Sequence, residues 1–393
     1  MNHTLIHNDE PAKIDLLNRS QYARAFAELA QICETPLVIG LYGPWGIGKT
    51  TMMQQIRASL EQSNVKTVWF DPWQNQFNDY PAVSLLQALV ESIENTRTKT
   101  RCREILADIA RAFSAIMLSS ATELGVDIKT LFAQYEEDRF RARSIQAKLK
   151  DYFEELIRTV HGKLKDSRIV FFIDDLDRCM PETVLKVLES LKLYLNLPNC
   201  VYFLAVDKLA LERSIEYHYQ GIGTDHVHYL DKMVQLPFFI PPIASDCLTE
   251  FINALLSPPL QICVDLLVIG LGENPRQIKR FINTLTLNHL LMTALDPRYD
   301  PRILTFILLI QYLDTTLYQK IANQPELLMQ LQRSAKSVPI ELQPLFKRIK
   351  ISPKVDLSPY IFFTNNHDYT QQIIDTDQLR EKLDGMLTHS RGG

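Results

Sequence analysis

The sequence lacks the compositional extremes that mark fibrous, disordered or linker-rich proteins. Its 393 residues include only 13 Gly, 20 Pro and 6 Cys, which excludes a collagen-like chain. The 42 Lys and Arg residues nearly balance 46 Asp and Glu residues, so the formal net charge of −4 gives no global reason to expect a nucleic-acid-coating protein. With 46% apolar and 22% charged residues, the chain is expected to fold into two or three domains.

Long apolar runs and paired cysteines are also missing. The most apolar window, Ile303 to Leu313, has about half of the roughly 20 residues that a membrane-spanning helix needs, so no membrane span is predicted. The N-terminus has neither the basic start nor the apolar stretch of a signal peptide. The cysteines are scattered without a CxxC pair, which argues against a zinc site or disulfide framework and predicts a cytoplasmic protein.

Short apolar runs alternate with helical patterns over the first two thirds of the chain. Because the runs are apolar throughout, they indicate a mostly parallel five-stranded sheet covered by helices on both faces, an α/β fold. The predicted strands are residues 36–43, 65–70, 168–173, 200–206 and 234–240.

The pattern also predicts a domain division. We expect an N-terminal helical segment over residues 1–35, a core over 36–242 and a C-terminal helical lid domain over 243–393. A helical insertion is predicted at about 82–165, within the core.

The most specific chemical signal is a glycine-rich string between the first predicted strand and a helical stretch. It matches the G-x-x-x-x-G-K-[ST] pattern, in which the backbone curls so that successive N–H groups face a β-phosphate at a helix N-terminus. Lys49 is predicted to lie between the β- and γ-phosphates, and the Thr50 hydroxyl is a predicted Mg²⁺ ligand. The predicted nucleotide-binding residues are Gly43, Pro44, Trp45, Gly46, Ile47, Gly48, Lys49, Thr50 and Thr51.

Two acids follow the predicted strand 168–173. Asp174 is expected to serve as the carboxylate on the magnesium side, and Asp175 is placed to orient or deprotonate an attacking water. A carboxylate at the second position favours a hydrolase, although a cap or turn residue is an alternative for Asp175. Arg178, in the string DDLDR, either pairs with these acids or reaches a phosphate on a neighbouring subunit.

Asp207 ends the predicted strand 200–206. If that strand lies between those leading to Lys49 and Asp174, Asp207 would be a γ-phosphate sensor; otherwise it caps the following helix. The stretch Asp207-Lys208-Leu209-Ala210 does not match N-K-x-D, the motif that reads guanine, so ATP is favoured over GTP.

A basic helix face is predicted in the C-terminal domain. Asn274 and Pro275 suit the start of a helix that places Arg276, Lys279 and Arg280 on one side. We expect Arg276 to complete the catalytic site, with a solvated basic face as the alternative for the other two.

Six strings and their order resemble the KAP-type P-loop NTPases. Asp15 and Arg19 in the leading helix add to the resemblance, which covers roughly residues 15–290. Many relatives carry transmembrane helices between the nucleotide motifs, whereas residues 82–165 here are too polar to cross a bilayer. The strings are YGPWGIGKTT, WFDPW, FFIDDLDRCMPETV, LAVDKLALERSI, YLDKMVQLPF and NPRQIKRFIN.

This resemblance implies an ATP-hydrolysing core with ATP and Mg²⁺ as cofactors. We expect a nucleotide-driven switch or motor acting on an unidentified protein partner, and some bacterial relatives are linked to plasmids and to conflict with phage. The alternative is a slowly hydrolysing regulatory module that signals by homo-oligomerisation. Basic clusters at Arg97–Arg103 and Arg139–Arg143 are compatible with nucleic acid, but they are better explained as solvated helix faces.

Overall fold

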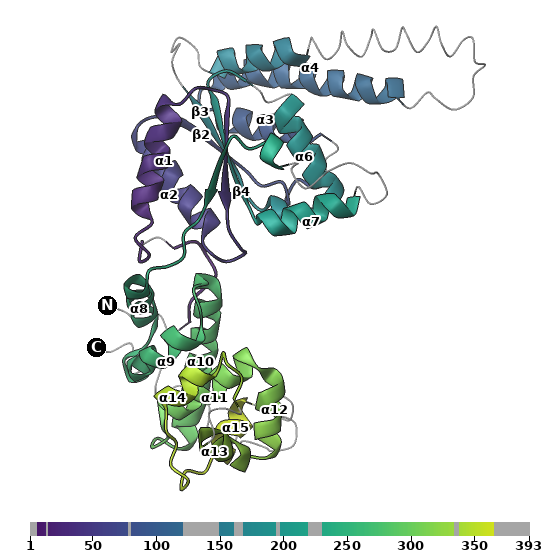
Figure 1. The fold of residues 1–393 in the computed structure, drawn as a ribbon. Coiled ribbons are helices and arrows are strands. Elements are labelled where there is room, and N and C mark those ends of the chain that lie inside the picture. The colour runs from purple at the N-terminus through teal and green to yellow at the C-terminus, as the bar shows by residue number, and fades with distance from the viewer. Residues whose placement is uncertain are drawn as a thin grey trace, which may run out of the picture. The chain divides into compact units, whose positions relative to one another are not determined.

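The computed structural model describes residues 6–12, 15–77, 80–120, 149–160, 168–193, 197–218, 230–333 and 338–364. The chain divides into two compact units, one of residues 19–241 and one of residues 1–18 with 242–393 (Figure 1). The predicted N-terminal helical segment, residues 1–35, contributes to both units. The first helix belongs to the 19–241 unit, because its apolar side chains pack on that unit's core.

The 19–241 unit is built around a five-stranded sheet whose strand order is β2-β3-β4-β1-β5. All four neighbouring pairs are parallel, which confirms the predicted α/β architecture. The strands are β1 (Leu37–Tyr42), β2 (Lys66–Phe70), β3 (Ile169–Ile173), β4 (Cys200–Val206) and β5 (Leu236–Phe239).

Strand β4 lies between β1 and β3, as the sensor hypothesis for Asp207 requires. Tyr42 pairs with Val206 at the end of the β1–β4 ladder, and Ile173 pairs with Leu204 in the neighbouring ladder. Because the strands are parallel, their carboxyl ends meet at one edge of the sheet. The segments that follow β1, β3 and β4 therefore converge there.

Helices cover both faces of this sheet, and Figure 1 shows α1 and α2 on one side and α3, α6 and α7 on the other. One core joins α1 and α2 to alternate sheet residues such as Ile39 and Phe203. The opposite core joins the remaining helices to residues such as Phe171 and Tyr202. The helices are α1 (Ser20–Ile32), α2 (Lys49–Gln62), α3 (Pro81–Glu91), α4 (Thr96–Ser120), residues 149–160, α6 (Pro181–Leu193) and α7 (Lys208–His218), with short 3₁₀ turns η1 (Leu176–Arg178) and η2 (Leu230–Lys232).

The predicted insertion is helical where the structure describes it, in α3, α4 and residues 149–160. Within the first basic cluster, Arg101 pairs with Glu104 at 3.0 Å and with Glu155 at 2.8 Å. These exposed ion pairs support a solvated helix face. The second cluster, Arg139–Arg143, lies outside the described residues.

The second unit is helical, as the sequence predicts for residues after 242. The apolar window at Ile303 to Leu313 forms α11, in which every residue from Ile303 to Ile310 is buried in the core of this unit. Among the helices that the structure describes, none combines the length and apolarity needed to span a membrane. The elements are α8 (Ser245–Leu255), the 3₁₀ turn η3 (Pro258–Cys263), α9 (Val264–Gly270), α10 (Pro275–Leu295), α11 (Pro301–Leu313), α12 (Thr315–Asn323), α13 (Glu326–Arg333), α14 (Gln343–Arg348) and α15 (Ser358–Thr364).

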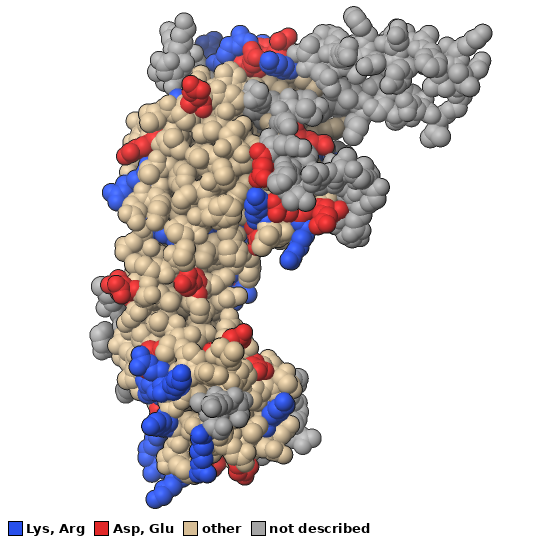
Figure 2. Space-filling view, viewed as in Figure 1, with Lys and Arg blue, Asp and Glu red and all other residues tan. Residues whose placement is uncertain are grey.

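Charged side chains of both signs lie on the face of each unit that Figure 2 shows. Figure 2 shows blue and red side chains on both units, separated by broad tan areas. This distribution agrees with the formal net charge of −4.

Stacked aromatic rings cross the middle of the sheet. Phe172 on β3 lies 5.7 Å from the Trp69 ring on β2 and 5.2 Å from the Phe203 ring on β4, and both pairs are nearly parallel. Side chains opposite one another on neighbouring strands stabilise a sheet through such contacts. The stack therefore adds side-chain contacts to the backbone pairing of β2, β3 and β4.

We predict that Phe172→Ala destabilises the 19–241 unit by about 3–5 kcal/mol, because a fully buried ring leaves a cavity. All three tryptophans, Trp45, Trp69 and Trp73, belong to this unit, so their fluorescence follows its unfolding in urea. The control Phe77→Ala, at an exposed ring, should change the free energy of unfolding by less than about 0.5 kcal/mol. Equal effects of the two substitutions would show that the Phe172 ring is not part of the core of this unit.

Candidate nucleotide-binding site

The glycine-rich string forms a tight loop between the end of β1 and the start of α2. Gly46 and Gly48 have φ angles of 86° and 105°, which residues with a side chain rarely adopt. A Cβ atom at Gly43 would lie 2.8 Å from the Ile47 side chain, so only glycine fits there. The loop therefore has the curled backbone that the phosphate-binding pattern predicts.

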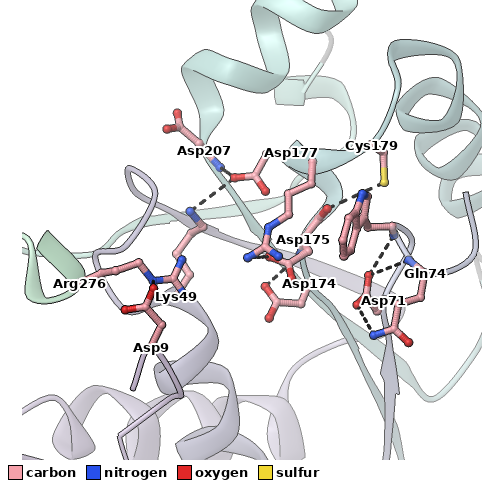
Figure 3. A network of polar contacts seen from close by, with 12 residues as sticks. Asp9, Lys49, Asp71, Gln74, Asp174, Asp175, Asp177, Cys179, Asp207 and Arg276 are labelled. Carbon is pink, nitrogen blue, oxygen red and sulfur yellow. Dashed lines mark hydrogen bonds and ion pairs between the residues drawn. The ribbon is translucent and has the colours of Figure 1, made fainter. Parts of the chain in front are cut away.

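Lys49 is held inside this loop, and only 8% of the residue is exposed. Its ammonium donates a hydrogen bond to the Gly43 carbonyl at 2.9 Å and a longer one to the Pro44 carbonyl at 3.4 Å. It also forms an ion pair with Asp177 at 3.5 Å, shown in Figure 3. The loop carbonyls and Asp177 therefore hold a buried cation in place.

Asp177 connects the segments that follow three strands. Besides pairing with Lys49, its carboxylate accepts a hydrogen bond from the backbone N–H of Asp207 at 3.0 Å. Asp177 lies in η1, which follows β3, whereas Asp207 directly follows β4. The sequence pattern pointed to no separate role for Asp177, although its place in DDLDR was a signal.

Asp174 lies at the end of β3, is almost fully buried and contacts the start of α2. The Thr50 hydroxyl is hydrogen-bonded to its carboxylate, and the Asp175 N–H donates to it at 3.0 Å. Burial and the neighbouring Asp175 carboxylate raise the Asp174 pKa to about 6, although the Thr50 hydrogen bond opposes this rise. A hydroxyl and a carboxylate in contact are a donor set that fits Mg²⁺, which prefers oxygen ligands.

Asp175 begins the η1 turn, and its side chain pairs with Arg178 instead of capping the turn. It has a left-handed backbone with φ of 56°, and its carboxylate lies 2.9 Å from the Arg178 guanidinium. That guanidinium also lies 5.8 Å from the centre of the exposed Trp73 ring. Burial raises the Asp175 pKa, and the charge of Arg178 partly offsets the rise. Of the two interpretations of Arg178, the structure shows pairing with the acids.

The Asp207 side chain caps the following helix. Its carboxylate accepts a hydrogen bond from the Ala210 N–H at 3.2 Å, in the first turn of α7. In Figure 3 the Asp207 carboxylate points away from Lys49, while its backbone N–H meets Asp177. The capping alternative is therefore observed, and the role as a γ-phosphate sensor stays a prediction.

The remaining predicted loop residues differ in exposure. Ile47 is buried, Trp45 is 44% exposed and Thr51 lies in the first turn of α2. The loop thus presents an indole ring to solvent on the segment that curls around Lys49.

Arg276 belongs to the second unit, at the start of α10. The Asn274 side chain accepts hydrogen bonds from the Arg276 and Gln277 N–H groups at 3.1 and 3.3 Å, which confirms the predicted cap. Asp9 forms ion pairs with both Arg276, at 3.8 Å, and Arg280. The basic face of α10 is therefore in contact with the N-terminal segment, a contact the sequence pattern did not reveal.

The curled loop, its buried lysine and the acids after β3 define a P-loop NTPase core. The chain belongs to the KAP family: the model of the KAP family P-loop domain matches residues 19–292. This match confirms the resemblance found in the sequence motifs.

Among curated proteins, the chain is similar to the Phage T7 exclusion protein of Escherichia coli (strain K12), with 23% identity over 250 residues. The match covers 56% of this chain but only 32% of that protein, so the chain corresponds to about a third of its relative. Two solved structures are more distant. The ORC2 protein of Aeropyrum pernix is 12% identical (TM-score 0.40, covering 98% of this chain and 88% of that one), and the Walker-type ATPase paby2304 of Pyrococcus abyssi is 13% identical (TM-score 0.35, covering 97% and 93%).

The raised pKa of Asp174 predicts a pH-dependent stability in the absence of nucleotide and metal. The native carboxyl keeps its proton up to about pH 6, whereas the unfolded one loses it near its ordinary value of 3.8. Raising the pH from 4 to 7 therefore lowers the contribution of this carboxyl to the free energy of unfolding. Asp174→Asn removes this loss and should be more stable than wild type at pH 7 by up to about 3 kcal/mol.

The measurement is urea unfolding followed by tryptophan fluorescence at pH 4 and at pH 7. The stability advantage of Asp174→Asn should be small at pH 4 and large at pH 7. An advantage that does not change between these pH values would show that the Asp174 carboxyl is not held protonated by its surroundings.

Proposed function

We propose that this chain binds ATP with Mg²⁺ and hydrolyses it in the cytoplasm, and that hydrolysis drives a switch or motor acting on a protein partner. The observation that supports this most is the convergence of Lys49, Thr50, Asp174 and Asp177 at the carboxyl edge of one parallel sheet. Open α/β sheets bind ligands at this edge.

Each of these side chains has a chemical task in the proposal. Lys49 would bind the β- and γ-phosphate oxygens, and Asp177 holds it in place through the ion pair at 3.5 Å. Thr50 and Asp174 would hold Mg²⁺, which supplies charge neutralisation between the phosphates. The N–H groups from Gly46 to Thr50 cradle the phosphate at the N-terminus of α2.

Asp175 is the proposed proton acceptor for the attacking water. Burial raises its pKa, which makes a carboxylate a better base, but the ion pair with Arg178 holds it at 2.9 Å. Catalysis therefore requires Arg178 to release Asp175. This ion pair also favours a second candidate function, a slowly hydrolysing regulatory module that signals by homo-oligomerisation. In that case Arg178 releases Asp175 when a neighbouring subunit engages Arg178.

A similar curated protein, the Phage T7 exclusion protein, supports a proposal for the biological process. We propose that the nucleotide cycle of this chain serves conflict with phage or other mobile elements, acting through a protein partner. Arg276 is the proposed cation that completes the site in cis, because the Asn274 cap fixes its direction at the start of α10.

The phosphate-loop assignment predicts the behaviour of Lys49→Ala. Saturating ATP with Mg²⁺ should stabilise the wild type by about 2.7 kcal/mol at a hundred times the dissociation constant, because a ligand that binds only the native state shifts the unfolding equilibrium. Lys49→Ala should lose this stabilisation while remaining folded. The measurement is the thermal shift with and without ATP and Mg²⁺.

The control for Lys49→Ala is Lys150→Ala, at an exposed lysine in the same unit. This variant should keep the wild-type thermal shift with ATP. If Lys49→Ala shifts as much as the control does, the assignment of the loop is wrong.

The proton-acceptor assignment predicts that Asp175→Asn binds ATP but does not turn it over. An amide has the shape of a carboxylate but cannot take up the proton, so phosphate release should fall by about 10²-fold or more. Arg178→Gln provides the contrast, because it frees the Asp175 carboxylate and should not abolish turnover if the site works in cis. Wild-type phosphate release by Asp175→Asn would remove this residue from the chemistry.

A further inference from the structure

Arg19 is a buried charged residue that the proposed chemistry does not use. Only 6% of it is exposed, and it occupies the position just before α1. A buried guanidinium is retained only where acceptors satisfy its donors, because desolvating an unpaired charge is costly. Its acceptors therefore indicate what it holds in place.

Two of the acceptors come from segments far apart in the sequence. One guanidinium nitrogen donates to the Ile47 carbonyl inside the phosphate loop, and the other donates to the Pro241 carbonyl at 3.1 Å. A Cβ atom added to Gly48 would lie 3.0 Å from the same guanidinium. Arg19 is thus packed directly against the loop that holds Lys49.

The contact with Ile47 also orients the cradle. In a planar trans peptide, the carbonyl and the following N–H point to opposite sides. Drawing the Ile47 carbonyl toward Arg19 therefore turns the Gly48 N–H the other way, away from the guanidinium. The left-handed backbone at Gly48 is compatible with this orientation.

Arg19 lies at one of the two points where the chain passes between its compact units, and its side chain contacts the residue at the other point. The chain enters the 19–241 unit between Asn18 and Arg19 and leaves it between Pro241 and Pro242. The guanidinium of Arg19 binds the carbonyl of Pro241, so one side chain joins the two crossing points to each other and to the phosphate loop.

We infer that Arg19 is a positioning residue that couples the conformation of the phosphate loop to both chain crossings. When phosphate fills the loop, the Ile47–Gly48 peptide is fixed from one side by the ligand and from the other by Arg19. The fork of the guanidinium transmits this constraint to the Pro241 carbonyl, and a change in the loop alters the backbone at both crossings. The inference rests on the proposed binding of ATP in this loop.

The test compares Arg19→Gln and Arg19→Lys with the control Arg24→Gln, which alters an exposed arginine on the same helix. ATP affinity is measured by titration with Mg²⁺ present. Hydrogen exchange is measured for the amides of residues 16–19 and 243–246, with and without saturating ATP. Exchange at the crossings is a readout that a purely local effect on the loop would leave unchanged.

We expect ATP to change exchange at both crossings at least threefold in the wild type and in Arg24→Gln. Arg19→Gln should bind ATP roughly tenfold more weakly, as expected for the loss of a charge-assisted hydrogen bond, and should lose the response at both crossings even at saturation. Lysine keeps the positive charge but has one nitrogen instead of the two that donate to the Ile47 and Pro241 carbonyls. Arg19→Lys should therefore keep the exchange response at one crossing at most.

A wild-type response at both crossings in ATP-saturated Arg19→Gln would overturn the inference. If Arg19→Gln does not fold, Arg19→Lys decides, because a full response at both crossings in that variant contradicts the need for the fork. Failure of the proposed function gives a different result, since the wild type would then show no ATP binding at all. Binding by the wild type without any change at the crossings would refute the coupling alone.

Discussion

The buried ion pair between Lys49 and Asp177 is the constraint on which the rest of the site depends. Both side chains are less than 10% exposed, and removing either would leave an uncompensated charge inside the protein. Asp177 also accepts the N–H of Asp207. The segments that follow β1, β3 and β4 are therefore joined at one point, beside the loop that surrounds Lys49.

The two acids that follow β3 have different partners. Burial raises the pKa of both Asp174 and Asp175, and a different group opposes the rise at each. Thr50 satisfies Asp174 from the first turn of α2, whereas Arg178 neutralises Asp175 from within the same short turn. Perturbed carboxylates of this kind are concentrated at functional sites. In the proposed reaction Asp174 lies on the metal side and Asp175 on the water side, and these different partners agree with that proposal.

Features determined by local sequence were predicted correctly, because their causes lie within a few residues. The strands, the curled loop and the Asn274 cap all depend on neighbouring residues. The pairing of Lys49 with Asp177 and the contact of Arg19 with Ile47 join positions that are far apart in the chain. No spacing rule reveals such contacts.

The most direct test of the central claim is magnetic resonance of Mn²⁺ bound in place of Mg²⁺. With a non-hydrolysable ATP analogue present, we predict one Mn²⁺ per chain with hyperfine coupling to phosphorus, and loss of this signal in Thr50→Ala. That result would place metal and phosphates together beside the loop. Mn²⁺ that binds without the nucleotide and shows no coupling to phosphorus, or a coupled signal unchanged in Thr50→Ala, would contradict the assignment of this site.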